Sequence, residues 1–513
     1  MTTTARRPLR RGAARRHGVA PLAGRATAGW PADRRADGDV LGWPAPGSYS
    51  GPPRRWLARH PAWPVTALLA GYPLWWALGL ADFMFALLAI PMAAGMYAWK
   101  VRQHRSIRLP PGFGLWLLFL VVMLAGAAML TLTAPDTVRS EVSHRVISFV
   151  NRAADYGGVT ILLLYAGNLT ERELSRRRLA WLLGLLAVYT AAGGMAGVLD
   201  PSFQFNSPAL RLLPHSVQAN SFIQASMHPG FAQLQNVIGV IQGRPKAPFD
   251  YTNAWGNCLS LLLGWLVVGW WVYGTRKQRV ITVIVLVTAI VPLVYSLDRG
   301  VWIGLGFAIC YIAVRMAARG KVALLGAVFA GLTLAGIVIL ASPLQHIVGQ
   351  RLSHGKSNTI RASLSTVAVE DARSSPIIGY GDTRQQRGSP HSIAVGPTTN
   401  CQLCGQYAVG SNGQLWLLLV CSGFVGAALY VGFFGYAVWR YRRDTTPYGL
   451  AGTLALLLPF LYMFTYVAVV APLALTMLSY ALLWRNDRQS RHDAGPADQE
   501  RTSLSAMTAG APT

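Results

Sequence analysis

Residues 179–199 read LAWLLGLLAVYTAAGGMAGVL, a run of 21 residues without a charged side chain. Arg176, Arg177 and Arg178 stand directly before this run, and Asp200 stands directly after it. The run is about as long as an α-helix must be to cross the hydrocarbon core of a bilayer, which takes roughly 20 residues. A helix also satisfies its backbone hydrogen bonds internally, as lipid requires. The stretch therefore predicts a membrane-spanning helix.

Similar apolar runs recur along most of the chain. Of its 513 residues, 52% are hydrophobic and only 13% are charged, about half the charged share of a soluble domain. This composition excludes soluble globular, disordered, collagen-like and disulfide-scaffold proteins. The apolar runs are residues 62–80, 82–99, 112–133, 146–168, 179–199, 253–274, 280–297, 301–318, 322–342, 413–439, 448–469 and 471–485. They predict an all-α fold, a polytopic transmembrane helical bundle of about 12 spans.

The basic residues predict the orientation of this bundle. Alternate connections, together with the two tails, hold 33 of the 46 lysines and arginines, and the other connections hold 13. Because cytoplasmic connections carry the excess of Lys and Arg, both termini are predicted in the cytoplasm. The net charge of +26 then indicates topology, and no nucleic-acid partner is expected. The predicted location is the plasma membrane of a bacterial cell, and the heavy use of Ala, Arg and Gly suits a GC-rich bacterial gene.

The composition changes at both ends of the chain. Residues 1–60 contain no apolar run, so we predict a disordered basic cytoplasmic tail, with attachment to anionic lipid headgroups as the alternative. Residues 61–485 form the predicted membrane domain, and residues 486–513 form a second disordered cytoplasmic tail.

Two connections on the predicted outer face are long, residues 200–252 and 343–412. Connections of this length are usually functional or disordered. Both contain aromatic residues, prolines and apolar stretches, which favour ordered structure. Over residues 215–242 we expect one or two amphipathic helices on the membrane surface.

The few charges on the outer face are candidate functional groups. Arg299 lies in Asp298-Arg299-Gly300, a predicted turn between two spans at the membrane boundary, where a charge is costly and tends to be functional. Its alternative role is an ion pair with Asp298. Arginine offers a planar fork of donors that matches phosphate oxygens. Several arginines beside apolar helices suit a ligand with a phosphate head and a lipid tail, although contacts with lipid headgroups or nearby acids are the alternative.

Cys401 and Cys404 form a Cys-x-x-Cys motif in the second long connection. On the oxidising side of a membrane this motif predicts a structural disulfide. A redox-active pair is the alternative, but no thioredoxin-like pattern surrounds it. The outer histidines show no metal-ligand spacing, and the first outer connection contains no acidic pair. We therefore expect neither a metal site nor a cofactor.

Three passages occur in order between residues 200 and 470. They are RPKAPFDYTN (244–253), YSLDRGVW (295–302), and a series made of Arg361, PIIGYG (376–381), SNGQLW (411–416) and GFVG (423–426). This series resembles the O-antigen ligase/polymerase family of bacterial membrane proteins. That family shows an Arg…Phe…Asn stretch, a Ser-Arg-Gly-like turn, an Arg followed by Pro-x-x-Gly-x-Gly, and a His-Asn pair leading to a Gly-x-x-Gly span. The order of the motifs and the topology carry the resemblance.

The resemblance implies a multi-helical transferase of the GT-C type. Such an enzyme moves a glycan from an undecaprenyl-diphosphate carrier to a glycan or lipid acceptor on the outer face, without a metal. It implies that Arg299 and Arg361 hold the diphosphate and that Arg244 lines the same cavity. Fixed guanidinium groups in a partly dry site can stabilise the charge that develops on the leaving group. The sequence does not separate ligase from polymerase activity.

The resemblance also implies a histidine that acts as general base on the acceptor hydroxyl. Where the family has His-Asn, this sequence has residues 411–412, Ser-Asn, and a histidine occurs upstream as His391. We predict His391 as the base, brought to the same place by an insertion in the connection. The alternatives are Glu370, Asp371 or Asp382 as the base, or a protein that has lost the reaction.

The main alternative function is a 12-span secondary transporter or a lipid or glycan flippase, because an even number of spans with both termini inside is a common transporter layout. Carriers tend to place charges within their spans, and these spans are nearly free of charge. The long connections also fall asymmetrically, after the fifth and the ninth predicted spans. A structural or assembly role is the third class.

Overall fold

The computed structural model describes residues 60–135, 137–138, 142–214, 227–236, 241–320, 356–386 and 407–493, with scattered residues between 326 and 350. Four predicted features lie wholly or largely outside the described residues: the tail before residue 60, the ninth apolar run, the part of the 343–412 connection that contains His391, Cys401 and Cys404, and the chain after residue 493. The described part is mostly helical, as predicted, and its strands are short.

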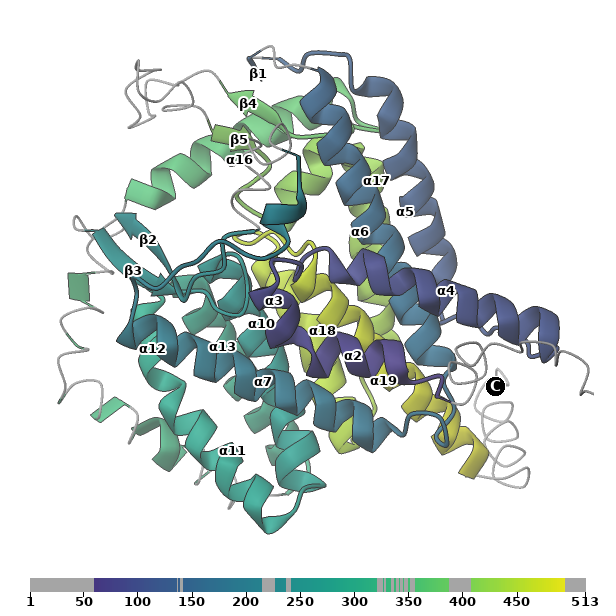
Figure 1. Cartoon of the computed structure of the whole chain (residues 1–513), viewed down its shortest axis with the longest axis vertical. Coiled ribbons are helices and arrows are strands. Elements are labelled where there is room, and N and C mark those ends of the chain that lie inside the picture. The colour runs from purple at the N-terminus through teal and green to yellow at the C-terminus, as the bar shows by residue number, and fades with distance from the viewer. Residues whose placement is uncertain are drawn as a thin grey trace, which may run out of the picture. The chain divides into compact units, whose positions relative to one another are not determined.

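Each of the other eleven apolar runs forms helix (Figure 1). The elements are α2 (Trp63–Ala70) and α3 (Tyr72–Ala77), α4 (Met84–Arg102), α5 (Phe113–Ala125) with the 3-10 turn η1 (Gly126–Met129), α6 (Val142–Asn168), α7 (Arg176–Leu199), α10 (Thr252–Leu266) with the π-helical η3 (Val267–Val272), α11 (Arg276–Thr288) and α12 (Ile290–Tyr295), α13 (Arg299–Ala317), α17 (Gln414–Tyr441), α18 (Pro447–Tyr462) and α19 (Ala471–Asp493). Among the described residues, six helices are long and apolar enough to cross a membrane: α4, α7, α10 with η3, α11 with α12, α13, and α17. The fold is that of a helical membrane protein, and the count of 12 spans stays a prediction.

Side chains that cap the following helix set three of the turns. Ser175 accepts a hydrogen bond from a backbone N–H of the first turn of α7 at 3.1 Å. Thr275 and Gln278 form a reciprocal capping box at the start of α11. Thr446 caps α18, whose first residue is proline. These Ser and Thr residues satisfy N–H groups that would otherwise lack a partner at a helix start.

The basic connections lie together at one end of the helices. Arg177 donates to the carbonyl of Tyr273. Arg315 donates to the carbonyl of Asp444 at 2.7 Å, and Asn486 donates to the carboxylate of Asp444 at 2.8 Å. Connections that are distant in sequence therefore meet on one face. The alternation of basic and less basic connections in the sequence agrees with this grouping.

The remaining described connections meet at the opposite ends of the same helices. The backbone N–H of Gln414, at the start of α17, donates to the carbonyl of Tyr466 before α19. In the first long connection, Arg244 donates to the carbonyl of Ser296 before α13 at 2.6 Å. The charge distribution remains the basis for assigning this second face to the outside of the cell.

The first long connection contains a β-hairpin. Strands β2 (Ala232–Asn236) and β3 (Ile241–Pro245) pair antiparallel, with Gln233 opposite Arg244. The expectation of amphipathic helices is therefore wrong for this part, while residues 215–226 lie outside the described chain. The physical reason is visible in β2, where apolar and polar residues alternate with the period of a strand.

The second long connection is ordered in the parts that the structure describes. It contains α16 (Lys356–Ser374), β4 (Arg384–Gln386) and β5 (Tyr407–Val409). Together with β1 (Thr137–Val138), these strands form an antiparallel sheet in the order β1-β4-β5. The expectation of ordered structure in both long connections is confirmed for these residues.

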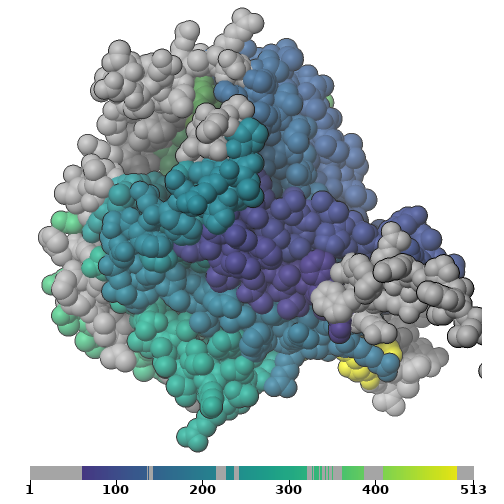
Figure 2. Space-filling view, viewed as in Figure 1, coloured from purple at the N-terminus to yellow at the C-terminus, as the bar shows by residue number. Residues whose placement is uncertain are grey.

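The first long connection packs on the N-terminal helices. Trp76 of α3 stacks on Phe231 with ring centroids 5.9 Å apart and planes 13° apart, and it meets Phe205 edge-on. Figure 2 shows the purple N-terminal helices lying against the teal atoms of this connection. This packing helps to hold the connection, and with it Arg244, against the helix ends.

Candidate functional site

The turn between α12 and α13 buries a carboxylate. Leu297 has a φ of 55°, and Asp298, which follows it, is 5% exposed. Tyr466, in the connection between α18 and α19, donates its hydroxyl to Oδ1 of Asp298. Within the described part of the chain, Oδ2 of Asp298 is buried without a hydrogen-bond partner. A buried carboxylate is costly unless positive charge or donors compensate it.

Arg244 reaches this turn from β3. Its Nε donates to the carbonyl of Ser296 at 2.6 Å, and its two terminal nitrogens donate to Oε1 of Gln235 at 2.5 Å and to Oδ1 of Asn253 at 3.3 Å. The side chain is 8% exposed. Arg244 therefore joins the hairpin, the start of α10 and the turn that carries Asp298.

Arg361, on α16, acts electrostatically on the same carboxylate. Its carbonyl accepts a hydrogen bond from Nδ2 of Asn412 at 3.3 Å, and the same amide donates to Oγ of Ser365 at 3.0 Å. Asn412 thus fixes the backbone of α16 at the turn that carries the Arg361 side chain. The Arg361 side chain is half-buried, and among the described residues none accepts a hydrogen bond from its guanidinium group. Arg361 is the arginine of this cluster with donors available for a ligand.

Asp298 interacts electrostatically with Arg244, Arg361 and Tyr466. Burial raises the pKa of the Asp298 carboxyl, and the nearby Arg244, the Tyr466 hydroxyl and Arg361 each lower it. Burial also lowers the pKa of Arg244. The negative charge of Asp298 raises this pKa, and the positive charge of Arg361 lowers it. Two arginines next to one buried carboxylate leave a surplus of positive charge, which favours binding of an anion. We call Arg244, Asp298, Arg361 and Tyr466 the turn cluster.

A small, mainly apolar pocket begins at Tyr466 and lies among α10, α17, α18 and α19. Its walls include Tyr430, Val431, Phe434, Phe460, Met463 and Pro472. The amide of Gln414 also lines it and is held in place, because it donates to the Tyr156 hydroxyl at 3.0 Å and accepts from the N–H of Ala468 at 2.9 Å. An apolar pocket therefore adjoins a charged cluster, an arrangement suited to a ligand with one apolar and one charged end.

The two glycine motifs that carry the family resemblance touch each other. Gly423 interrupts α17 with a φ of 64°, and the N–H of Phe424 donates to the carbonyl of Pro376 at 2.8 Å. A Cβ at Gly423 would lie 2.5 Å from that carbonyl oxygen, and one at Gly379 would lie 2.5 Å from the backbone of α17. Only glycine allows this approach. The contact anchors the end of α16, the helix that carries Arg361.

Three arginines are predicted at the diphosphate site, Arg299 and Arg361 as ligands and Arg244 as a residue that lines the cavity, and the structure relates two of them through one carboxylate. Arg244 and Arg361 both act on Asp298. Arg299 begins α13 directly after Asp298 and is half-buried there. For Arg244, the geometry adds that its donors are already engaged by protein acceptors, so it positions the turn as well as lining the site.

The acids named as alternative bases differ in their surroundings. Asp382 pairs with Arg152 at 2.8 Å, which occupies its carboxylate. Asp371 is fully buried and Glu370 is exposed on α16. The predicted base His391 and the predicted disulfide of Cys401 and Cys404 lie outside the described residues, so their roles stay predictions.

Asp298 and Tyr466 do not stand out from the sequence as parts of a site. The sequence predicts Asp298 only as the partner of Arg299. A carboxylate between two apolar runs is nevertheless as costly near the membrane as an arginine. Tyr466 offers no signal of its own, because a tyrosine at the end of an apolar run is common at membrane boundaries.

Among the described residues, no group of three or more His, Cys, Asp or Glu side chains is arranged to hold a metal ion. No protein-family model, no curated protein and no solved structure matches the chain.

Proposed function

We propose that the chain is a multi-pass bacterial membrane enzyme that transfers a glycan from an undecaprenyl-diphosphate carrier to an acceptor at the outer face of the cell membrane. The activity would resemble that of an O-antigen ligase or polymerase and would serve cell-surface polysaccharide assembly. The observation that supports it is that Arg244 contacts the buried turn at Asp298 while the charge of Arg361, from the other long connection, acts on the same carboxylate. The apolar walls of the pocket beside Tyr466 are of the chemical type that would contact a lipid chain.

In this proposal Arg361 binds the diphosphate. Its guanidinium group is half-buried and donates to no acceptor among the described residues, and a planar fork of N–H groups matches phosphate oxygens. Arg244 and Asn412 position it, the first by holding the Asp298 turn and the second by holding the backbone of α16. Arg299, at the first turn of α13, is proposed as a second ligand of the diphosphate.

The reaction needs charge stabilisation on the leaving group. The acceptor hydroxyl oxygen forms a bond to the anomeric carbon, the bond from that carbon to the diphosphate oxygen breaks, and the diphosphate leaves with the electron pair. Guanidinium groups that are fixed before the reaction stabilise the charge that develops there. This role of fixed cations is the basis for proposing a mechanism that does not require a metal.

The acceptor proton passes to a base, for which we propose His391. Asp298 is a second candidate, because its Oδ2 is buried without a partner in the described structure and its pKa is raised by burial. A base with a pKa closer to neutrality takes up a proton more effectively at physiological pH. The two candidates are separated by His391→Ala and Asp298→Asn, each compared for the rate of transfer at several pH values.

The deciding experiment compares Arg361→Ala with Arg373→Ala in proteoliposomes that contain a labelled undecaprenyl-diphosphate glycan. Both arginines lie on α16, and Arg373 is exposed, so it serves as a matched control. We expect Arg361→Ala to reduce transfer by about 10²–10³-fold and Arg361→Lys to restore part of it. Arg373→Ala should keep full transfer.

The same vesicles test the alternative class. A transporter or flippase would move the labelled compound across the bilayer without making a transfer product. Movement without transfer by the wild-type protein, or equal transfer by Arg361→Ala and Arg373→Ala, would contradict the proposed function.

A further inference from the structure

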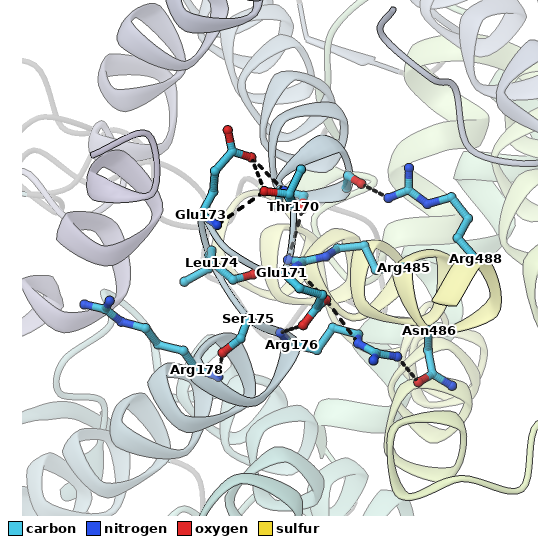
Figure 3. Close-up of polar contacts among 12 residues, drawn as sticks. Thr170, Glu171, Glu173, Leu174, Ser175, Arg176, Arg178, Arg485, Asn486 and Arg488 are labelled. Carbon is cyan, nitrogen blue, oxygen red and sulfur yellow. Dashed lines mark hydrogen bonds and ion pairs between the residues drawn. The ribbon is translucent and has the colours of Figure 1, made fainter. Parts of the chain in front are cut away.

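A second charged region lies at the other end of α19 from the turn cluster. There the chain forms a solvent-open hollow of about 1250 Å³ between residues 105–108, residues 168–172 and the last turns of α19. Five arginines line it: Arg105, Arg108, Arg172, Arg485 and Arg488. Figure 3 shows Arg485 and Arg488 projecting from α19 toward the turn that contains Thr170 and Glu171. Figure 2 shows the end of α19, in yellow, at the surface of the molecule.

Three of these arginines are fixed by carbonyls at the end of α6 and in the connection that follows it. Arg485 donates to the carbonyls of Leu174 and Ala166, Arg488 donates to that of Gly167, and Arg105 donates to that of Asn168. The last carbonyls of a helix lack partners within the helix and form the negative end of its dipole. These contacts explain why the arginines gather here, and they hold the side chains in place before any ligand arrives.

Two aromatic rings fix the guanidinium groups further. Arg105 lies over the ring of Trp99 at 4.5 Å, and Arg488 lies over the ring of Trp484 at the same distance. Arg485 is 3% exposed. Because the planes of these groups are set, little side-chain freedom would be lost when an anion binds.

The acids nearby do not balance this charge. Glu171 pairs with Arg485 at 2.9 Å and with Arg176 at 3.1 Å, and Glu173 pairs with Arg105 at 3.0 Å. Among the described residues, the five lining arginines outnumber Glu171 in the lining and Glu173 beside it, which leaves three positive charges in excess. Burial and, to a smaller extent, repulsion by neighbouring arginines such as Arg108 together lower the pKa of Arg488 to about 10.

Among the described residues, none accepts a hydrogen bond from the side chain of Arg108 or Arg172. Both side chains are exposed at the rim of the hollow. At Arg108 only the backbone is tied down, through a pair of 2.9 Å hydrogen bonds with the amide of Asn168. Their guanidinium groups are therefore the ones best placed to meet an incoming anion beside the fixed Arg485 and Arg488.

The position of the hollow favours a lipid as the source of the anion. α4, one of the helices able to cross a membrane, ends at Arg102, just before Arg105. Tyr97, Val101 and Leu109 expose apolar side chains on either side of that end, 70%, 50% and 56% exposed respectively. A headgroup in the hollow would thus have apolar protein surface beside it for its acyl chains.

We propose that this hollow is a binding site for a phosphate-bearing anion, with the headgroup of an anionic phospholipid as the ligand that its position favours. It lies at the opposite ends of the helices from the turn cluster, so it does not depend on the proposed transferase activity.

The test uses the full chain purified in mild detergent. Dispersed phosphatidylglycerol and phosphatidylcholine are titrated separately, and bound lipid is counted by native mass spectrometry, while inorganic pyrophosphate is titrated by calorimetry. The double variant Arg108→Gln with Arg172→Gln removes two charges from the rim. The matched control, Arg102→Gln with Arg178→Gln, removes two exposed charges on the same face that do not line the hollow.

We expect the wild-type protein to retain phosphatidylglycerol in preference to phosphatidylcholine. The rim variant should bind phosphatidylglycerol about tenfold more weakly and the control variant within about twofold of wild type. Pyrophosphate binding that is lost in the rim variant, without any preference between the lipids, would support the phosphate site and assign a soluble ligand. Equal binding by the rim and control variants, with unchanged thermal unfolding, would overturn the proposal.

Discussion

The hydroxyl of Tyr466 donates a hydrogen bond to Oδ1 of Asp298, and both side chains are buried. This bond joins the connection before α19 to the turn before α13. Arg244 and Arg361 act on the same carboxylate from the two long connections. Four parts of the chain that are far apart in sequence therefore meet at one buried acid.

Tyr466→Phe tests this bond directly. The variant keeps the ring and removes the side-chain donor to Oδ1 of Asp298. A buried acceptor without its partner costs about 1–3 kcal/mol. We expect the unfolding free energy in detergent to fall by that amount, with transfer activity reduced as the turn shifts. Unchanged unfolding would show that the hydroxyl does not stabilise the turn.

Asp298 should make stability depend on pH. Burial raises its pKa in the folded protein above the unfolded value of 3.8, so folding favours the protonated form. The unfavourable contribution is absent below the unfolded pKa, grows as pH rises, and is complete above the folded pKa. Asp298→Asn removes this titration. We expect the stability of wild type relative to Asp298→Asn to decrease as pH rises from about 4.

The measurement for this prediction is a series of unfolding midpoints for both proteins across pH. A difference between the two curves that is flat, or that increases with pH, would contradict the raised pKa of Asp298.

Gly300→Ala should disturb the Asp298 turn from the side of α13, which begins there. A Cβ at Gly300 would lie 2.2 Å from the hydroxyl of Tyr466, so the ring must move away from Asp298. Gly306 lies on the same helix and is the matched control, because a Cβ there would meet no atom within 4 Å. We expect a loss of about 1–3 kcal/mol in unfolding free energy for Gly300→Ala. Gly306→Ala should be neutral or slightly stabilising, because alanine favours helix.

Equal effects of the two alanines would mean that the contact with Tyr466 is not tight. In that case the stability of both variants would depend only on the helix propensity of alanine. The inferred close contact between α13 and Tyr466 would then be contradicted.

Apolar runs were sufficient to predict the helices, because a long uncharged stretch in lipid has few other ways to satisfy its backbone. They were not sufficient to predict interruptions within the helices. Gly71 separates α2 from α3, and Gly423 breaks α17. The chain has 52 glycines, and nothing local distinguishes Gly423, because its φ of 64° depends on contact with Pro376.

The candidate site was predictable only in part. Arg244 and Arg361 stand out because charge is scarce on the predicted outer face. The resemblance to a known series of motifs implies that Arg361 holds the diphosphate and that Arg244 lines the same cavity. Their relation through Asp298 required a fold, since hydrogen bonds between distant turns leave no spacing in the sequence. Asn412 shows the same limit: its bond to the carbonyl of Arg361 is set by the position of α16 against α17.

Gly423→Ala should uncouple α16 from α17. Its Cβ would lie 2.5 Å from the carbonyl oxygen of Pro376, and alanine rarely adopts a φ of 64°. Gly432 on the same helix has its nearest neighbour at 3.9 Å and is the control. We expect Gly423→Ala to lower the unfolding free energy by about 1–3 kcal/mol and to reduce transfer as Arg361 shifts, whereas Gly432→Ala retains both.

The two effects of Gly423→Ala can be separated. Unfolding in detergent reports the strain, and the apparent KM for the lipid-linked donor reports the position of Arg361. Because the contact with Pro376 lies at the end of α16, we expect the KM for the donor to rise more than the KM for the acceptor. A variant that loses stability while keeping wild-type KM values would show that the Gly423 contact supports the fold without positioning Arg361.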